Sequence, residues 1–177
     1  MKLINILFSF FICFFTSNVF SQNIAVINIQ SLIDNNYKYN EMIKEMELNQ
    51  KKFLNKFDLR EEELKFLLND IEESKLILSE KEINAKINDY NNQLSDFTIK
   101  VDDFNFHYQN QIIILRESVL KEIIILIEKY AIENDIDLIL DSNSYLIASN
   151  SLDITNLINI ELEKINFKLE YKSFENY

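Results

Sequence analysis

The feature that most constrains the fold is a pair of apolar repeats between residues 43 and 115. In each repeat the core positions are separated alternately by three and four residues, which is the spacing of a coiled-coil seam. The positions are Ile43, Met46, Gln50, Phe53, Phe57, Arg60, Leu64, Leu67, Ile71, Ser74 and Leu78 in the first repeat, and Ile83, Ile87, Tyr90, Leu94, Phe97, Val101, Phe104, Tyr108, Gln111 and Leu115 in the second. Seventeen of these 21 positions are apolar, whereas the 47% apolar content of the chain predicts about ten. The pattern predicts two long helices folded back on each other.

Capping residues predict where these helices begin and end. Ser79 lies between the repeats and is followed three residues later by Glu82, which is the pattern of a capping box at the start of a helix. We therefore expect the tip of the hairpin near residue 79. Ser31 and Asp34 form a second capping box, so the first helix is expected from about Ser31 to Leu78, roughly 70 Å at ~1.5 Å per residue.

Short apolar segments on either side of the hairpin are predicted to be strands. They are residues 24–29, residues 135–141 with an apolar face of Ile136, Leu138 and Leu140, and Tyr145–Ala148 after a turn at residues 142–144. Asp153 is expected to cap a last helix from Ile154 to about Lys172. The apolar face of that helix is predicted at Leu157, Ile160, Leu162 and Ile165, and Phe167, Tyr171 and Phe174 continue it into an aromatic tail.

The strands and the base of the second helix are expected to need more than one copy of the chain. Three short strands do not form a stable sheet alone, because their edges stay open. Residues 111–127 are apolar almost all round, so that part of the helix must be buried by something else. Both needs are met if several copies pool their strands into one closed sheet. The candidate residues of this shared body are Ile24, Val26, Ile123, Ile127, Ile136, Leu138 and Leu140. The predicted fold is α+β and mostly α: a small β body, an oligomeric barrel, with a long antiparallel coiled-coil arm.

The N-terminus is typical of a secretory signal peptide. Lys2 supplies a positive charge, residues 3–15 form an apolar run, and fairly small residues at Val19 and Ser21 fit a cleavage site. We expect cleavage near Gln22, with an uncleaved anchor as the alternative. Cys13 is the only cysteine and lies in this segment, so the mature chain is expected to have no thiol chemistry and no disulfide.

Composition argues against several classes of function. The chain contains neither Gly nor Pro, so a Walker loop or a Rossmann fingerprint is excluded. Its net charge of −11 makes it a poor candidate for nucleic acid or for anionic lipid surfaces.

Residues that could carry chemistry have simpler structural explanations. His107, the only histidine, has no partner nucleophile and is expected to be solvated or packed on the arm. Asp135, Asp137 and Asp141 lack the glycine and the terminal Glu of a calcium loop, which favours solvated or capping roles. We predict that the protein is not an enzyme and uses no cofactor or metal.

Four apolar residues lie outside the seam and form a candidate contact stripe. Leu59 and Phe66 are one heptad apart on the first helix, and Ile99 and Phe106 are one heptad apart on the second. Each lies well over 90° from the seam at 100° per residue. They are either stray surface residues of a chain rich in apolar residues or a thin adhesive stripe for a partner.

The two ends of this plan resemble the Skp (OmpH-like) family of periplasmic chaperones. Residues 24–32, Ile-Ala-Val-Ile-Asn-Ile-Gln-Ser-Leu, look like the first strand and helix start of that family. Residues 134–143 are similar to its second strand and turn, and Asp153-Ile-Thr155 matches the start of its last helix. The motifs are short, but they occur in the expected order with a long arm between them.

The resemblance implies a homotrimer in the periplasm. Each subunit of such a trimer gives strands to a central barrel and one helical hairpin to a set of three tentacles, which enclose unfolded outer-membrane proteins without ATP. One departure concerns charge, because residues 41–110 carry 10 basic and 16 acidic side chains, a net −6, whereas better-known members are basic. A lipopolysaccharide site is therefore not carried over to this chain.

Two functional hypotheses follow. The first is an ATP-independent holdase that binds unfolded outer-membrane β-barrel proteins, with contact candidates Leu59, Phe66, Ile99 and Phe106 and only indirect contact with the membrane. The second is an exported coiled-coil adaptor that has no client. The expected organisation is a signal peptide at residues 1–21, a β body of residues 22–30 and 134–177, and a hairpin arm of residues 31–133 whose base packs on the body.

Overall fold

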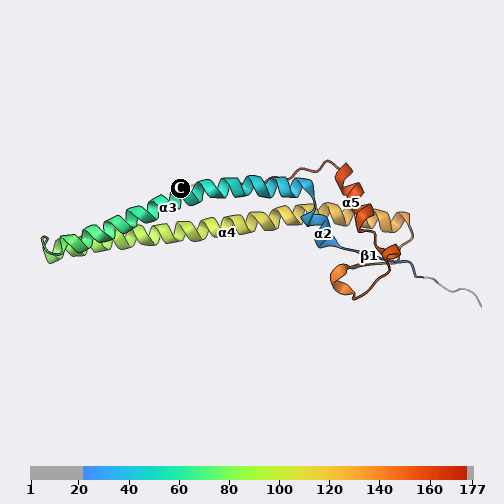
Figure 1. The fold of residues 1–177 in the computed structure, drawn as a ribbon, viewed down its shortest axis with the longest axis horizontal. Helices are drawn as coiled ribbons and strands as arrows, with labels where there is room; N and C mark the ends of the chain where they lie inside the picture. Colours follow the sequence, from blue (N-terminus) through green and yellow to red (C-terminus); the bar gives the residue numbers. More distant parts are fainter. Residues whose placement is uncertain (1–21, 175–177) are drawn as a thin grey trace, which may run out of the picture.

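The structure, a computed structural model, describes residues 22–174 of the chain. The predicted signal peptide and Cys13 lie outside the described residues. The elements are, in chain order, β1 (Ile24–Ile27), α2 (Ile29–Asp34), α3 (Tyr37–Ser74), α4 (Glu80–Glu133), β2 (Leu138–Asp141), the short 3₁₀ helices η1 (Ser142–Ser144) and η2 (Asn150–Leu152), and α5 (Thr155–Lys164). α3 and α4 form a long hairpin, with the other elements gathered at its open end (Figure 1). The predicted mostly helical α+β fold is confirmed.

The seam between α3 and α4 contains most of the residues that the repeats predicted, but Leu94 is 39% exposed and Leu78 lies beyond the end of α3 at Ser74. Met46, Leu64 and Ile71 are the buried residues of α3, and all three are predicted seam positions. On α4 the ring of Phe104 stands edge-on to that of Phe57, with centroids 5.1 Å apart. At 54 residues, α4 is roughly 80 Å long, because the seam gives it a partner along most of its length.

The tip of the hairpin is closed by the predicted capping box. The Ser79 N–H donates to Glu82 Oε2 at 2.9 Å, and the Glu82 N–H donates to Ser79 Oγ at 3.4 Å. Two of the free donors at the start of α4 are satisfied in this way, so the chain reverses direction here without glycine or proline.

The predicted start of the first helix at Ser31 is wrong. α2 begins two residues earlier, where Asn28 Oδ1 accepts the Ser31 N–H at 2.8 Å. α2 ends at Asp34, and Asn36 then caps α3 by accepting the Tyr39 N–H at 2.9 Å. Asparagine side chains compete with helical backbone bonds, so the helix breaks at Asn35–Asn36 and starts again in a new direction.

The body contains two parallel strands joined through the arm. β1 pairs with β2 in the register Ile24 opposite Leu138 and Ile27 opposite Asp141. Asp135 follows α4 with a φ of 49°, the left-handed conformation that usually falls to glycine after a helix. The Ile136 N–H then donates to Ala131 O at 2.9 Å, which satisfies one of the last carbonyls of α4.

Two of the strand predictions need correction. The second strand starts at Leu138 rather than at residue 135, and Ile139 packs against the core while Leu138 is exposed. The third strand, Tyr145–Ala148, does not form: among residues 22–174 the sheet has only β1 and β2. Leu146 and Ile147 are 101% and 92% exposed, because no neighbouring strand in the single chain lies beside them.

The last helix is shorter than predicted, and its buried face differs. α5 ends at Lys164 instead of about Lys172. Its buried residues are Ile158 and Leu162, with the buried N-cap residue Ile154 before them. The prediction is correct for Leu162 and for Ile165, which packs against the core, but the predicted core residues Leu157 and Ile160 are exposed. Spacing of four residues selects the face that meets α4. Asp153 does have the predicted role, since its Oδ1 accepts the Thr155 N–H at 2.8 Å.

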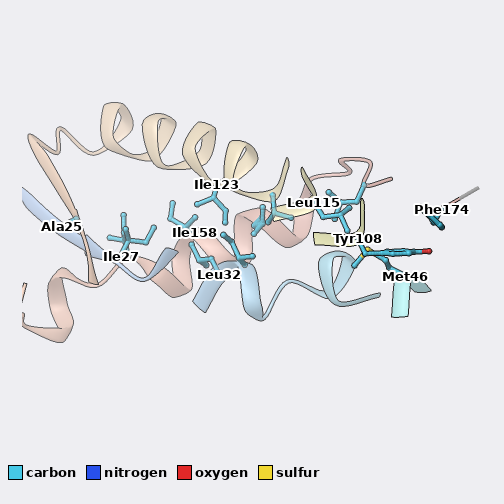
Figure 2. Close-up of a cluster of buried hydrophobic side chains, with 14 of the residues drawn as sticks. Ala25, Ile27, Leu32, Met46, Tyr108, Leu115, Ile123, Ile158 and Phe174 are labelled. Carbon is cyan, nitrogen blue, oxygen red and sulfur yellow. The ribbon is translucent and has the colours of Figure 1, made fainter. Parts of the chain in front are cut away.

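One continuous core joins the body to the base of the arm (Figure 2). It extends from Ala25 and Ile27, past Ile123 and Ile158, to Tyr108 and Phe174. Part of the cover that the base of α4 requires therefore comes from α2, α5 and the C-terminal segment of the same chain.

Candidate functional site

The four residues of the predicted contact stripe all lie on the exposed sides of the arm. Leu59 and Ile99 are exposed, and Phe66 and Phe106 are 73% and 72% exposed. Apolar side chains of this size gain free energy when a partner covers them, because covering removes their surface from water. The structure therefore brings these residues out to solvent, where a partner can reach them.

The register of the hairpin fixes where the stripe lies along the arm. Arg60 donates to Gln93 Oε1 at 2.7 Å, and Lys86 Nζ lies 2.5 Å from Asp70 Oδ2. Phe57 contacts Phe97 across the seam, with ring centroids 5.9 Å apart. Leu59 lies just toward the tip from this contact and Ile99 just toward the base. Phe66 lies one heptad nearer the tip on the outer side of α3, and Phe106 lies one heptad nearer the base on the outer side of α4.

Sequence analysis missed several exposed apolar residues on the arm, of which four stand out. Leu48 lies eleven residues before Leu59, about three helical turns, and Ile113 lies one heptad after Phe106, so they extend the stripe toward the base. Leu76 and Ile77 are 93% and 85% exposed at the tip. All four could have been found from the sequence, because they lie outside the predicted seam. Leu76 and Ile77 also lie just before the capping box that marks the tip.

The candidate residues of the shared body fall into two groups. Val26 and Ile123 are buried within the single chain, so they belong to its core and cannot meet a second copy. Ile24, Ile127, Ile136 and Leu140 are half-buried, and Leu138 is exposed. Other exposed apolar residues near the body were missed by the sequence analysis: Ile125, Ile132, Leu146 and Ile147.

The aspartates beside the strands have capping roles. Asp137 Oδ2 accepts the Asn23 N–H at 2.9 Å, and Asp141 Oδ1 accepts the Ile29 N–H at 3.2 Å. Burial acts to raise the pKa of the Asp141 carboxyl, but hydrogen bonds from Ile29, Asn143 and Ser142 outweigh it and hold that pKa below its usual value. Within residues 22–174 no group of three His, Cys, Asp or Glu side chains gathers around a possible metal position.

His107 is packed between the arm and the C-terminal segment. Its Nε2 lies 2.7 Å from the carbonyl oxygen of Lys172, to which it donates when that nitrogen carries the proton. Its ring lies 5.5 Å from that of Phe174. The aromatic tail, for which the sequence suggested no role, thus returns to the base of the hairpin.

No helix within residues 22–174 combines the length and the apolar content that crossing a bilayer requires. The most exposed apolar residues lie singly or in short groups on the arm and body.

Comparisons with known proteins agree with the architecture. The family model of outer membrane protein (OmpH-like) matches residues 23–162. A crystal structure of a candidate outer membrane chaperone (OmpH-like) from Caulobacter crescentus CB15 superposes with a TM-score of 0.63 at 10% identity, covering 85% of this chain and 92% of that one. Among curated proteins, none matches the chain. Since the family model spans most of the sequence, including both strands and the whole arm, the chain belongs to the OmpH-like family of outer membrane proteins.

Proposed function

We propose that this protein is an ATP-independent holdase that binds unfolded outer-membrane β-barrel proteins and prevents their aggregation. The observation that carries the proposal is the exposed stripe of Leu59, Phe66, Ile99 and Phe106 on a projecting two-helix arm. The OmpH-like family and the outer membrane chaperone fold of the Caulobacter protein support it.

The physical basis is many weak contacts in place of one tight site. Strands of outer-membrane barrels alternate apolar and polar residues, so an unfolded client offers a ladder of separated apolar side chains. Each contact with the stripe is weak, but several arms around one client raise the effective concentration of the others. Weak single contacts also allow release without an energy source, as a holdase without nucleotide requires.

A homotrimer would supply three such arms. The outer edge of β1 is partly covered, because Val26 O accepts the Ile154 N–H at 3.0 Å. The outer edge of β2 and the exposed Leu146 and Ile147 favour assembly through the body. In this arrangement the extended Tyr145–Ala148 segment would pair with a strand of a sister chain. The predicted signal peptide would deliver the protein to the periplasm, where contact with the membrane is indirect.

The proposal is tested by diluting an unfolded outer-membrane barrel protein from urea and following light scattering. We expect the chain to suppress aggregation at a stoichiometric amount of trimer. The double substitution Leu59→Ser with Phe66→Ser should weaken suppression about tenfold in the concentration needed. The matched control is Leu54→Ser with Leu68→Ser, which removes two exposed leucines of α3 about half a turn from the stripe and should have little effect.

Salt dependence separates apolar capture from charge attraction. The arm carries 10 basic and 16 acidic residues between positions 41 and 110, so we expect apolar contact to dominate. Client binding should change little between low and physiological salt, whereas charge attraction would weaken over that range. A strong loss of binding with added salt would contradict this part of the proposal.

The alternative is an exported coiled-coil adaptor without clients. Its supporting observation is the long arm itself, which is a suitable spacer whatever its surface. An adaptor would leave the aggregation of the barrel protein unchanged at every concentration, and that result would overturn the holdase proposal.

A further inference from the structure

The segment that follows α5, Ile165–Phe174, is an extended tail lying along the base of the hairpin (Figure 1). Its side chains alternate in burial as far as Ser173: residues 165, 167, 169, 171 and 173 are buried or half-buried, and the residues between them are exposed. Phe174, which follows Ser173 directly, is also buried, so the alternation ends there. Alternation with period two is that of a strand with one covered face. Here the covering surface consists of two helices instead of a sheet.

Side chains of the hairpin bond to the main chain of the tail. Gln111, a buried residue of α4, accepts the Lys172 N–H at 2.8 Å, and His107, one turn away, lies 2.7 Å from the Lys172 carbonyl oxygen. At the other end of the tail, Lys38 Nζ donates to the carbonyl oxygens of Ile165 and Phe167 at 3.2 and 3.3 Å. Main-chain bonds of this kind do not depend on the side chains of the bound segment.

The inward side chains of the tail enter apolar surroundings between α3 and α4. Leu169 and Phe174 are buried. The Phe174 ring stands edge-on to Phe53 and Phe104, at centroid distances of 5.6 and 5.4 Å. We call this surface the tail groove; it is formed by Lys38, Asn49 and Phe53 of α3 and by Phe104, His107 and Gln111 of α4.

The tail lies outside the part of the chain that defines the family. The OmpH-like match covers residues 23–162, so it includes every residue of the tail groove and none of the tail. The residues of the groove therefore lie within the family match, and those of the tail lie beyond its end.

We propose that the tail groove is a binding site for extended polypeptide segments that alternate apolar and polar residues, and that the tail occupies it as an internal competitor. The inference rests on the proposed function and names a second contact surface for the same clients. Main-chain bonds from His107, Gln111 and Lys38 would hold any extended segment, and the apolar positions of the groove select alternation. Strands of outer-membrane barrels have that alternation.

The tethered tail has a high effective concentration at the groove, in the millimolar range for short connections. A client segment gains access only in the fraction of molecules whose tail has left, and its apparent affinity is reduced by that fraction. Removing or displacing the tail should therefore tighten binding of an alternating peptide about tenfold or more.

A reversible disulfide that holds the tail in the groove tests the competition between tail and peptide within one protein. Ser173 Oγ and Asn49 Oδ1 are 3.0 Å apart, so Asn49→Cys with Ser173→Cys, in a Cys13→Ser background without other thiols, would fasten the tail in the groove. The probe is a fluorescein-labelled peptide as long as the tail, with Val and Tyr alternating with Lys and Glu, measured by anisotropy. We expect no binding to the oxidised protein, binding after reduction, and tighter binding to a variant truncated after Asn166.

The control peptide contains the same residues rearranged so that the apolar ones are adjacent. Equal binding of both peptides, or equal binding by the oxidised and reduced proteins, would overturn the proposal. Phe174→Asp keeps the tail but weakens its packing in the tail groove. This variant should therefore bind the alternating peptide as tightly as the truncated variant does, and it serves as a second test if truncation lowers stability. Circular dichroism at 222 nm establishes that each variant keeps its helices.

The two proposals can fail separately. If the oxidised protein suppresses aggregation and no form binds the alternating peptide, the holdase proposal stands and the groove proposal falls. If the reduced protein binds the alternating peptide and no form suppresses aggregation, the groove proposal stands and the holdase proposal falls.

Discussion

At the scale of single residues, short polar side chains determine where elements begin and end. Ser79 with Glu82 starts α4, and Asn28 and Asn36 start α2 and α3. Asp141 joins separate parts of the body, because its carboxylate accepts the Ile29 N–H at the start of α2 and, at 2.8 Å, the side-chain amide of Asn143 in η1. Glycine and proline usually mark the ends of helices and the turns between them. In a chain that contains neither, side-chain caps have that role.

The Asp141 carboxylate makes the stability of the body depend on pH. Its pKa is lower in the folded chain than in the unfolded chain, so its contribution is fully present above the unfolded pKa and is lost as pH falls through the folded pKa. Asp141→Asn should cost about 1–3 kcal/mol at pH 7 and should lose less further stability than the wild type between pH 6 and pH 3. Urea unfolding followed by circular dichroism measures both effects, with Asp58→Asn on the exposed side of α3 as the control. An unchanged pH dependence in Asp141→Asn would contradict the assignment.

At the scale of elements, the arm has two kinds of apolar position that sequence spacing separates correctly. Seam residues such as Leu64 are buried between the helices, while Phe66, two residues later, is exposed. The seam stabilises the hairpin by removing apolar surface from water, and the stripe does not contribute to that burial. The residues that stabilise the hairpin and those proposed to contact clients therefore lie on different faces of the same helices.

Substitution by alanine should affect stability on the seam face and client binding on the exposed face. Leu64→Ala should destabilise the hairpin by about 2–5 kcal/mol, because it leaves a cavity in the seam. Phe66→Ala should change stability by no more than about 0.5 kcal/mol, as is usual at exposed sites, while weakening client binding. Thermal unfolding of both variants checks this, and a large loss of stability in Phe66→Ala would place that residue in the packing of the arm.

At the scale of the whole molecule, one chain forms a connected core but leaves apolar surface at the body. The sheet has only two strands within residues 22–174, and the Tyr145–Ala148 segment presents Leu146 and Ile147 to solvent. Exposed apolar side chains beside a two-stranded sheet favour contact with another chain. The arm, in contrast, is complete within one chain and does not require assembly.

A substitution in the exposed segment of the body should therefore lower the mass of the assembly in solution while the helical arm stays folded. We expect Ile147→Lys to shift the protein from its oligomer toward the single chain in sedimentation equilibrium, with the helical signal at 222 nm preserved. Leu76→Lys, at the exposed tip of the arm and at the opposite end from the body, is the matched control for added charge. A protein that is a single chain before any substitution would contradict the proposed assembly.

The sequence by itself determined the hairpin, its seam, its tip and the exposed stripe. Each of these depends on contacts between neighbours along a helix or on one local cap, and the spacing of Leu64, Phe66 and Ser79 encodes such relations directly. It also placed β1 and approximated β2, because short β-branched runs are locally distinctive.

Only the tertiary structure decided the rest. The break at Asn35–Asn36 lets α2 pack on α4, the face of α5 is chosen by what it meets, and the tail leaves the helical conformation where it gains main-chain bonds from Lys38, His107 and Gln111. These outcomes depend on groups far apart in the sequence, whose packing and hydrogen bonds outweigh local preferences of a few tenths of a kcal/mol per residue. The local sequence pattern of an element does not show which distant surface the element will pack against.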